Sequence, residues 1–380
     1  MKLKRIRAAA AKAFNATRAW WGNTFTVLDR YIIRKFLGTF IFSLLLLLAI
    51  VMIFDVNEKL DALLKAPLYA TLNDYYLNFI PYFANQFAPL FTFIAVIFFT
   101  SKLAGNSEII AMLSSGMSFK RFIRPYLFSA LVIAVGSFVL SAYIIPPANV
   151  KRINYTNTYV KNKRVDFGAN IMFKASPEEI AYFSRYDNIS KMGTKISLET
   201  FDSTRQLTKR ITAQTARWDT LYNWTLNDYV VRTFDGPREY VTRGRSTDTI
   251  LPFEPRDFLI STGDWETMTT PALAAYIDRQ QMRGVGNIRD FQIEYHRRFA
   301  TTAAFFILTT IGVSLSSRKV KGGLGLNLGI GLVLSFSYIL FMTITQAFAV
   351  SGLTSPFVAM WIPNILYAII ALILYRRAAQ

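Results

Sequence analysis

The chain has 380 residues, of which 52% are hydrophobic and 18% are charged, and its formal net charge is +19 at pH 7. A single histidine and the absence of cysteine exclude a metal site of the usual His/Cys kind and leave no disulfide. The sequence also lacks the Gly-x-x-x-x-Gly-Lys-Ser/Thr pattern of a P-loop, so we expect no nucleotide site in this chain.

Apolar runs dominate the chain, and one long polar stretch separates the third run from the fourth. The runs lie near 36–54, 79–99, 126–145, 299–317, 324–348 and 357–375. Each is about as long as a helix that crosses the ~30 Å hydrocarbon core of a bilayer, which takes ~20 residues. Soluble proteins rarely contain so many core helices of this length. The pattern therefore predicts a membrane α-helical bundle of six transmembrane helices, three plus three, with an inserted domain.

Positive charge gathers beside one set of span ends. Lysines and arginines precede the first run, follow the sixth, and fill the loops at 100–125 and 316–323. The loop at 349–356 carries no charge, and the loop at 55–78 mixes both signs. This is the positive-inside pattern, which predicts cytoplasmic termini and an outer location for the long polar stretch. Topology and anionic lipid thus explain the basic balance, and nucleic acid is not needed.

Residues 1–28 form a basic extension before the first half of the bundle at 29–145. Lysines and arginines occur there with Phe14, Trp20 and Trp21, which favours an amphipathic helix at the membrane interface. A disordered basic tail explains the composition equally well.

The segment at 102–118 contains a short predicted helix on the cytoplasmic side. Asn106 or Ser107 suits its N-cap, Glu108 its first turn and Gly116 the position after its last turn. The apolar residues form one stripe, which consists of Ile109, Ile110, Met112 and Leu113. A capped helix with such a stripe can dock onto a soluble partner, and the alternative is a helix that rests on the bilayer surface.

From Pro146 and Pro147 onward the pattern changes, and 146–265 is predicted as an all-β domain. Short runs alternate apolar with polar residues and are separated by turns such as Asp235-Gly236-Pro237. This pattern predicts an antiparallel sandwich or open barrel. The large apolar side chains of the runs are Phe173, Phe183, Tyr222, Trp224 and Leu226. They pack a core or line a groove for acyl chains, and the sequence alone favours the core.

Residues 266–298 are predicted as a helix and a connection to the second half of the bundle at 299–380. His296 stands at the membrane boundary, where an interfacial histidine is expected rather than a catalytic base. The fifth run opens with Gly325-x-x-x-Gly329, a small-residue face for close helix packing, either with another chain or within this one. The spans carry few ionisable groups, which argues against an ion pathway, and we predict no catalytic residue.

Several short stretches form an ordered set along this layout. They are Leu28-Asp29-Arg30-Tyr31-Ile32, the run from Glu108 to Ser118, Arg124-Pro125, Ala213, Trp218, Trp224-Thr225-Leu226, Met268-Thr269, Leu273, Tyr276-Ile277, Glu294-Tyr295-His296-Arg297 and Arg318 with the glycines after it. From about Leu28 onward, the chain in this way resembles the LptF/LptG permeases of the lipopolysaccharide exporter.

The resemblance implies a permease subunit of an ABC-type exporter in the inner membrane, with two such permeases paired around a cavity. A dimer of a cytoplasmic ATPase would drive it and would hold the ATP and magnesium, so that this chain binds no cofactor. The outer domain would be a periplasmic β-jellyroll that receives lipopolysaccharide and passes it to bridge proteins like LptC and LptA.

The resemblance also implies roles for individual residues. The segment at 102–118 would be the coupling helix, whose contacts with the ATPase are assigned to Glu108, Ile109, Met112, Leu113 and Gly116. The first and fifth spans would form a lateral gate with Lys59 near lipid phosphates. The lipid path in the outer domain would be lined by Phe173, Phe183, Tyr222, Trp224 and Leu226.

Two functional classes remain open. The first is the permease of a lipid extractor, and the second is a membrane scaffold or assembly protein whose outer domain binds a partner protein and moves no lipid. A secondary transporter ranks third because the spans are nearly uncharged. An extractor would copurify with an ATPase and a bound glycolipid, and a scaffold with neither.

Overall fold

The computed structural model describes residues 25–160, 167–255, 258, 263–282, 288–318 and 323–379. The prediction for residues 1–28 therefore lies almost wholly outside the described residues. The chain divides into two compact units. The first comprises Met1–Glu58, Ile80–Ser141 and His296–Gln380, and the second comprises Lys59–Phe79 and Ala142–Tyr295.

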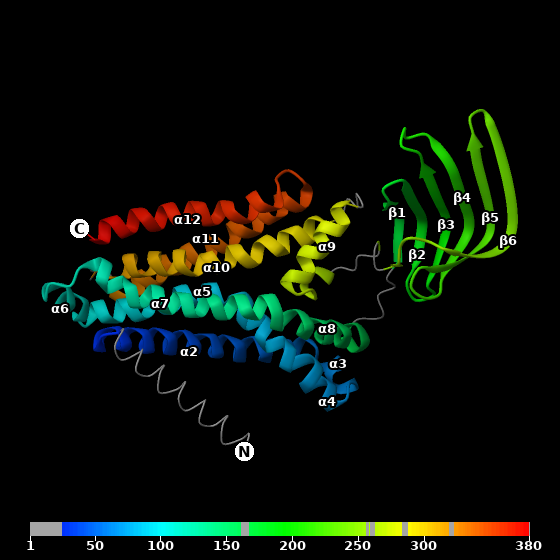
Figure 1. The fold of residues 1–380 in the computed structure, drawn as a ribbon. Coiled ribbons are helices and arrows are strands. Elements are labelled where there is room, and N and C mark those ends of the chain that lie inside the picture. The colour runs from blue at the N-terminus through cyan, green and yellow to red at the C-terminus, as the bar shows by residue number, and fades with distance from the viewer. Residues whose placement is uncertain are drawn as a thin grey trace, which may run out of the picture. The chain divides into compact units, whose positions relative to one another are not determined.

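The first unit is a helical bundle (Figure 1). Its helices are α2 (Val27–Glu58), α5 (Leu77–Gly105), α6 (Glu108–Ser114), α7 (Phe119–Val139), α10 (Arg289–Ser316), α11 (Gly323–Ser351) and α12 (Pro356–Ala379), of which α5 and α10 begin in the second unit. Among the described residues, six helices are long and apolar enough to cross a membrane. The predicted three-plus-three membrane bundle with an inserted β domain is confirmed.

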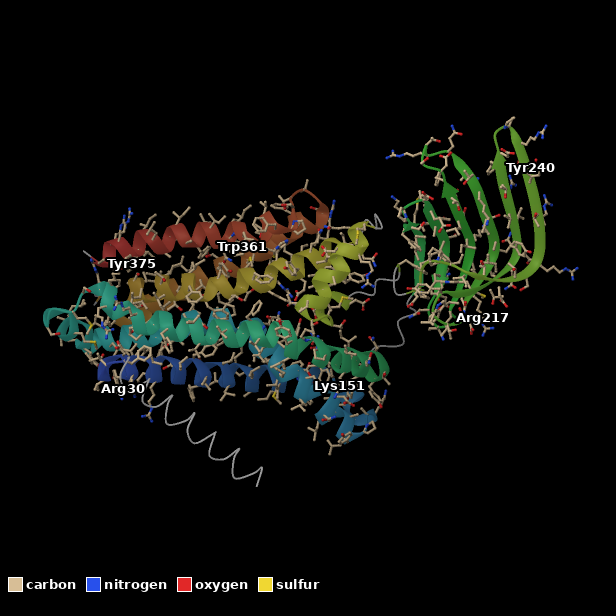
Figure 2. The ribbon with its side chains drawn as sticks, viewed as in Figure 1. Arg30, Lys151, Arg217, Tyr240, Trp361 and Tyr375 are labelled. Carbon is tan, nitrogen blue, oxygen red and sulfur yellow. The ribbon has the colours of Figure 1, made fainter. Side chains whose placement is uncertain are left out.

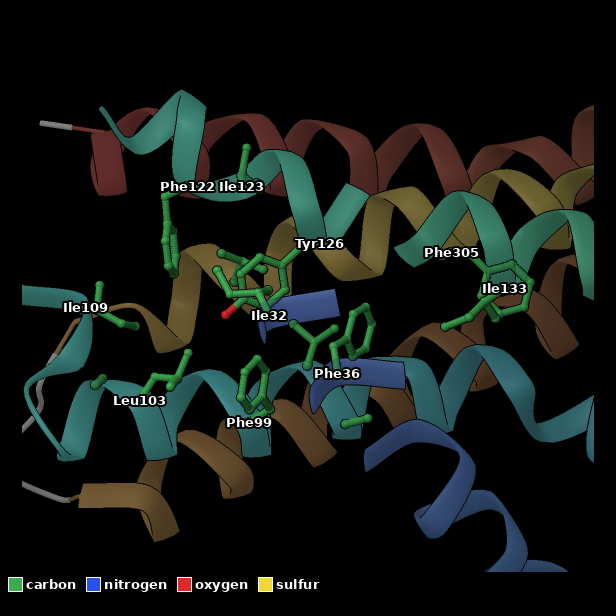
Figure 3. Packing of buried hydrophobic residues seen from close by; sticks show 14 of the residues in the cluster. Ile32, Phe36, Phe99, Leu103, Ile109, Phe122, Ile123, Tyr126, Ile133 and Phe305 are labelled. Atoms are coloured by element: carbon green, nitrogen blue, oxygen red, sulfur yellow. The ribbon is translucent and has the colours of Figure 1, made fainter. Parts of the chain in front are cut away.

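Aromatic and branched side chains hold one end of this bundle together. Phe36 of α2, Phe99 of α5 and Tyr126 of α7 pack around a common centre with ring centroids 6.0 and 6.1 Å from Tyr126 (Figure 3). Tyr126 and Phe36 are fully buried. Packing of this density, rather than a hydrophobic driving force, is what joins helices in lipid.

Two of the spans are much less covered than the others. Only 17% of the most apolar stretch of α2 and 22% of that of α11 are buried, against 61% for the span at Leu68–Gly105. The open surfaces carry large apolar side chains such as Phe42, Ile53 and Phe336. The first and fifth spans therefore present bare faces to lipid or to another membrane helix.

Helix continues well past the predicted start of the β domain at 146. After α7 the chain runs through a π-helical turn at Leu140–Ile144, then α8 (Ile145–Tyr155) and a second π-helical turn at Thr156–Val160. The predicted start of the β domain at Pro146 is therefore too early, because the first strand begins only at Phe167. Pro146 and Pro147 stand in the first turn of α8, where a residue without an N–H group costs little.

The remaining helices of the second unit are short. They are α3 (Leu60–Lys65), α4 (Leu68–Ala70), a π-helical turn at Thr71–Tyr76, a 3-10 turn at Asp264–Glu266 and α9 (Thr270–Met282). Leu273, Ile277 and Phe291 form a small buried cluster around α9. In this unit a 2.9 Å hydrogen bond between the hydroxyl groups of Thr71 and Tyr155 joins the π-helical turn to α8.

The β domain of this unit is a six-stranded antiparallel sheet whose strands follow the order of the sequence. The strands are β1 (Phe167–Ser176), β2 (Glu179–Asp187), β3 (Met192–Phe201), β4 (Leu207–Trp218), β5 (Asn223–Asp235) and β6 (Arg238–Ile250). The strands lengthen towards β6, whose side chains are mostly exposed, among them Tyr240 (Figure 2).

A transverse crease crosses all six strands at matching positions. One residue in each strand drops out of the ladder pairing: Asn170, Ser184, Lys195, Gln214, Asp228 and Arg245. Asn170, Lys195 and Asp228, on alternate strands, have left-handed backbones with φ near +50°. The register is the same on both sides of the crease, but the inward positions are three residues apart across it instead of two, as in Phe183 and Tyr186.

The crease brings the two halves of the sheet around one apolar interior. Phe183 and Trp224 come from opposite sides of it, and their ring centroids lie 5.7 Å apart. Phe258, from the return segment after β6, contacts both Phe173 and Tyr186, with ring centroids 5.1 and 5.2 Å apart. The inserted domain is thus an antiparallel β domain, as predicted, in which a single sheet with its strands in chain order bends around a shared apolar interior.

Candidate functional site

The helix that follows α5 is shorter than the predicted coupling segment at 102–118. Helix α5 continues to Gly105, and α6 covers Glu108–Ser114. Ser107 occupies the N-cap position, but its φ is +60° and its side chain caps nothing. The predicted N-cap position is therefore correct, but Ser107 does not cap α6 through its side chain. Gly116 has a φ of +91°, which fits its predicted place after the helix.

The apolar stripe of α6 divides between two faces. Ile109 is fully buried and Met112 nearly so, and both belong to the core cluster of the bundle (Figure 3). Ile110 is 53% exposed on the opposite face, and Ala111 and Ser114 are exposed with it. The sequence alone could not separate these faces, because the stripe of a short helix fits the bundle core and a partner surface equally well.

Glu108 is held by side chains of its own chain. Its Oε1 accepts a hydrogen bond from Asn106 Nδ2 at 3.1 Å, and its Oε2 accepts one from the Tyr31 hydroxyl at 3.3 Å. Tyr31 belongs to α2, so this contact joins the first span to α6. The arrangement fixes the direction of a carboxylate at the edge of the exposed face of α6.

Basic side chains surround this end of the bundle. Figure 1 places α6 at the end of the helical unit where α2 begins and α12 ends, and Figure 2 labels Arg30 and Tyr375 there. Tyr375 packs against Phe119 at 5.6 Å. Further cations at helix ends on this side are Arg34, Lys102, Lys120, Arg124, Arg318, Arg376 and Arg377.

The glycines of α11 fall into two groups. A Cβ built on Gly325 or Gly329 would meet nothing within 4 Å. A Cβ on Gly331 would lie 2.1 Å from Cδ1 of Ile97 in α5. Gly331 thus serves packing inside the chain, whereas the Gly325-x-x-x-Gly329 face is open.

Lys59 lies among aromatic side chains in the second unit. Its Nζ donates a 2.5 Å hydrogen bond to the Tyr75 hydroxyl and lies 5.1 Å from the centre of the Tyr75 ring and 5.9 Å from that of Phe79. The hydrogen bond to the Tyr75 hydroxyl holds the ammonium group in this place. These aromatic contacts could not be predicted from the sequence, because two short helices separate Lys59 from Tyr75 in the π-helical turn and from Phe79 in α5.

The predicted lipid-lining residues do not share one environment. Phe173, Phe183, Trp224 and Leu226 are at most 2% exposed, whereas Tyr222, in the turn between β4 and β5, is 47% exposed. The return segment after β6 covers the buried set with Leu251, Phe253 and Phe258. The Trp224 indole N–H donates to the Phe253 carbonyl at 3.1 Å.

One polar atom inside this interior stands alone. The hydroxyl of Tyr186 is buried and has no hydrogen-bond partner among the described residues. Burial raises the pKa of the Tyr186 phenol well above its usual value, so the group stays neutral. It can donate to any acceptor that enters the interior.

No group of three or more His, Cys, Asp or Glu side chains lies close enough in the described part of the chain to hold a metal ion. His296 packs edge-on against Phe357 with ring centroids 5.3 Å apart.

Comparison with known families adds one finding. The family model described as "Lipopolysaccharide export system permease LptF/LptG" matches residues 30–377, which is nearly the whole chain. No curated protein sequence matches the chain significantly.

Proposed function

Because the chain belongs to the LptF/LptG family of lipopolysaccharide export permeases, we propose that it is the transmembrane subunit of an ABC-type exporter that extracts lipopolysaccharide from the inner membrane. Permeases of this family are non-catalytic, multi-pass inner-membrane components of the Lpt transporter. The observation that carries the proposal is the nearly full-length family match on a three-plus-three bundle with an inserted β domain.

The driving force would come from a separate cytoplasmic ATPase dimer, which binds ATP and magnesium itself. The sequence has no P-loop, and the exposed face of α6 stands at the basic end of the bundle. By the positive-inside rule this end faces the cytoplasm, with both termini. Ile110 and Glu108 would then form the contact, while Ile109 and Met112 support it from inside.

A second LptF/LptG-type permease would cover the bare spans. Helices α2 and α11 have the least buried apolar stretches, and Gly325 and Gly329 offer an open face where another backbone can approach closely. The same two spans would form the lateral gate through which the lipid enters, and Lys59 would meet its phosphates after leaving the ring of Tyr75.

The β domain would lie in the periplasm, receive the lipid and pass it to bridge proteins like LptC and LptA. Its interior is apolar on both sides of the crease, and burial of an acyl chain contributes about 0.8 kcal/mol per CH₂. The unpaired hydroxyl of Tyr186 supports a ligand with an acceptor group. For lipid to enter, the return segment at Leu251–Phe258 would have to leave the interior.

One observation favours the second class, a scaffold that moves no lipid. Phe253 and Phe258 fill the interior so well that Trp224 is only 1% exposed. In that case the domain is a closed core that docks a partner protein.

Purification from the native membrane separates the two functions. The extractor predicts that the tagged chain brings down an ATPase and a second permease, and that mass spectrometry finds retained lipopolysaccharide. An Ile110→Asp variant should lose the ATPase but keep the other permease. A matched control is Ile189→Asp, since Ile189 is 62% exposed in a β-domain turn. Purification with neither ATPase nor glycolipid would support the scaffold.

A further inference from the structure

An ion pair joins the first span to the third beside α6. Arg121 Nη1 donates to Asp29 Oδ1 at 2.7 Å, and Arg121 Nη2 donates to Asp29 Oδ2 at 2.6 Å. Two parallel bonds of this kind fix both the distance and the angle between the groups. Asp29 is only 4% exposed. Its Oδ2 also accepts hydrogen bonds from the backbone N–H and the hydroxyl of Thr26, at 2.9 and 2.8 Å.

The pair stands at one end of the segment that would contact the ATPase. Ser118 ends this segment and caps α7 by accepting a hydrogen bond from the backbone N–H of Arg121. At the other end, the Tyr31 hydroxyl reaches Glu108. Both ends of the segment around α6 are therefore attached to the same first turns of α2.

Beyond these turns α2 is sparsely covered by its own chain. Ile32, Ile33 and Phe36 are buried beside the ion pair, and Leu48 and Asp55 are buried further along, whereas most large side chains from Ile41 to Phe54 are exposed. Because the first turns of α2 carry the paired charges and most of its buried side chains, movement of the α6 segment acts on α2 through them.

We propose that Asp29 and Arg121 are positioning residues that transmit movement of the α6 segment to the first span. This inference rests on the proposed function, since it needs an ATPase that moves α6. Apolar contacts such as Ile32 with its neighbours permit sliding and rotation. The paired charges do not, because both oxygens and both nitrogens must stay in register.

The test uses the full complex from native membranes, reconstituted in lipid, with Asp29→Asn, Arg121→Gln and the double variant. The matched control is Arg124→Gln, which removes one charge from an exposed position one turn further along α7. Lipopolysaccharide released per ATP hydrolysed is measured together with ATPase association and the thermal unfolding midpoint. The chain has no cysteine, so a cysteine in place of Ile53 carries a single spin label on the bare part of α2.

We expect each single variant to keep the ATPase and to lower release per ATP by about two- to thirtyfold, the range in which residues between coupled sites act. The double variant should be no worse than either single one, because the two residues act as a unit. The ATP-dependent change of the label spectrum should shrink in parallel. Arg121→Lys, which keeps the charge but loses the paired geometry, should fall between.

Release per ATP equal to that of Arg124→Gln would overturn the inference, as would a loss confined to the unfolding midpoint with an unchanged label response. If the unmodified complex holds no ATPase and releases no lipid, the proposed function fails instead. The unmodified complex thus decides between the two failures before any variant is compared.

Discussion

Gly331 and Ile97 pack so closely in the bundle that there is no room for a further atom between them. The position for a Cβ on Gly331 is 2.1 Å from Cδ1 of Ile97, which is 1% exposed. We expect Gly331→Ala to lower the free energy of unfolding by about 1–3 kcal/mol through overpacking. Ile97→Val removes the clashing methyl group, so most of this loss should disappear in the double variant.

Unfolding of the purified chain in detergent measures both effects. Gly329→Leu is the control on the same helix, since open space surrounds Gly329 within this chain. It should leave the unfolding free energy unchanged and instead weaken association with the second permease. An additive penalty in the Gly331→Ala, Ile97→Val double variant would show that the contact is made elsewhere.

Removal of the Tyr186 hydroxyl should change the stability of the β domain in a direction that can be stated in advance. It is buried without a partner among the described residues, and an unsatisfied buried donor costs about 1–3 kcal/mol. Tyr186→Phe should therefore stabilise the β domain by an amount in that range. Hydrogen exchange of the backbone amides in β2 and β3 reports it. Faster exchange in the variant would mean that the hydroxyl has a partner such as a trapped water.

At the scale of elements, the crease gives adjacent residues of one strand different backbone conformations. Lys195 has a φ of +49°, which costs a non-glycine residue roughly 1–2 kcal/mol. Lys195→Gly should remove this strain and leave the domain as stable or more stable. Thr194→Gly, one residue away in ordinary strand, should destabilise it by about 0.5–1 kcal/mol. Thermal unfolding of the two variants compares them, and equal losses would argue against a strained crease.

The elements differ in how far the sequence predicts them. The spans follow from apolar length, and the alternation of Tyr222, Trp224 and Leu226 indicates a strand. The crease could not be predicted, because a shift of one residue in the apolar–polar alternation of a short strand looks the same as an irregular alternation. The caps of α6 and the helix through Pro146 depend on local turns that long-range packing decides.

At the scale of the whole molecule, the layout and the family could be predicted from the sequence, because span length, charge bias and ordered motifs can be read without knowledge of contacts. The candidate sites could not be predicted in this way. Ile109 and Ile110 are neighbours of equal hydropathy, yet only Ile110 is exposed. Lys59 and Tyr75, and likewise Asp29 and Arg121, are brought together by helices whose packing no spacing reveals.

The orientation of the chain is open to a direct test, because the natural sequence has no cysteine to react. We expect an impermeant maleimide to label Tyr240→Cys in cells whose outer membrane is permeabilised, since Tyr240 is 56% exposed on β6. Ser115→Cys, exposed after α6, should react only once the inner membrane is broken. The unsubstituted chain is the blank, and the reverse labelling order would invert the topology.

The crease also limits how the β domain can change in evolution. Each strand carries its extra residue at the same transverse line, so neighbours agree about which side chains face inward on both sides of it. Deletion of one residue from a single strand would turn half of that strand inside out beside unchanged neighbours. Insertions and deletions among descendants of this sequence should therefore occur in the hairpin turns, or as a complete hairpin added at an edge of the sheet.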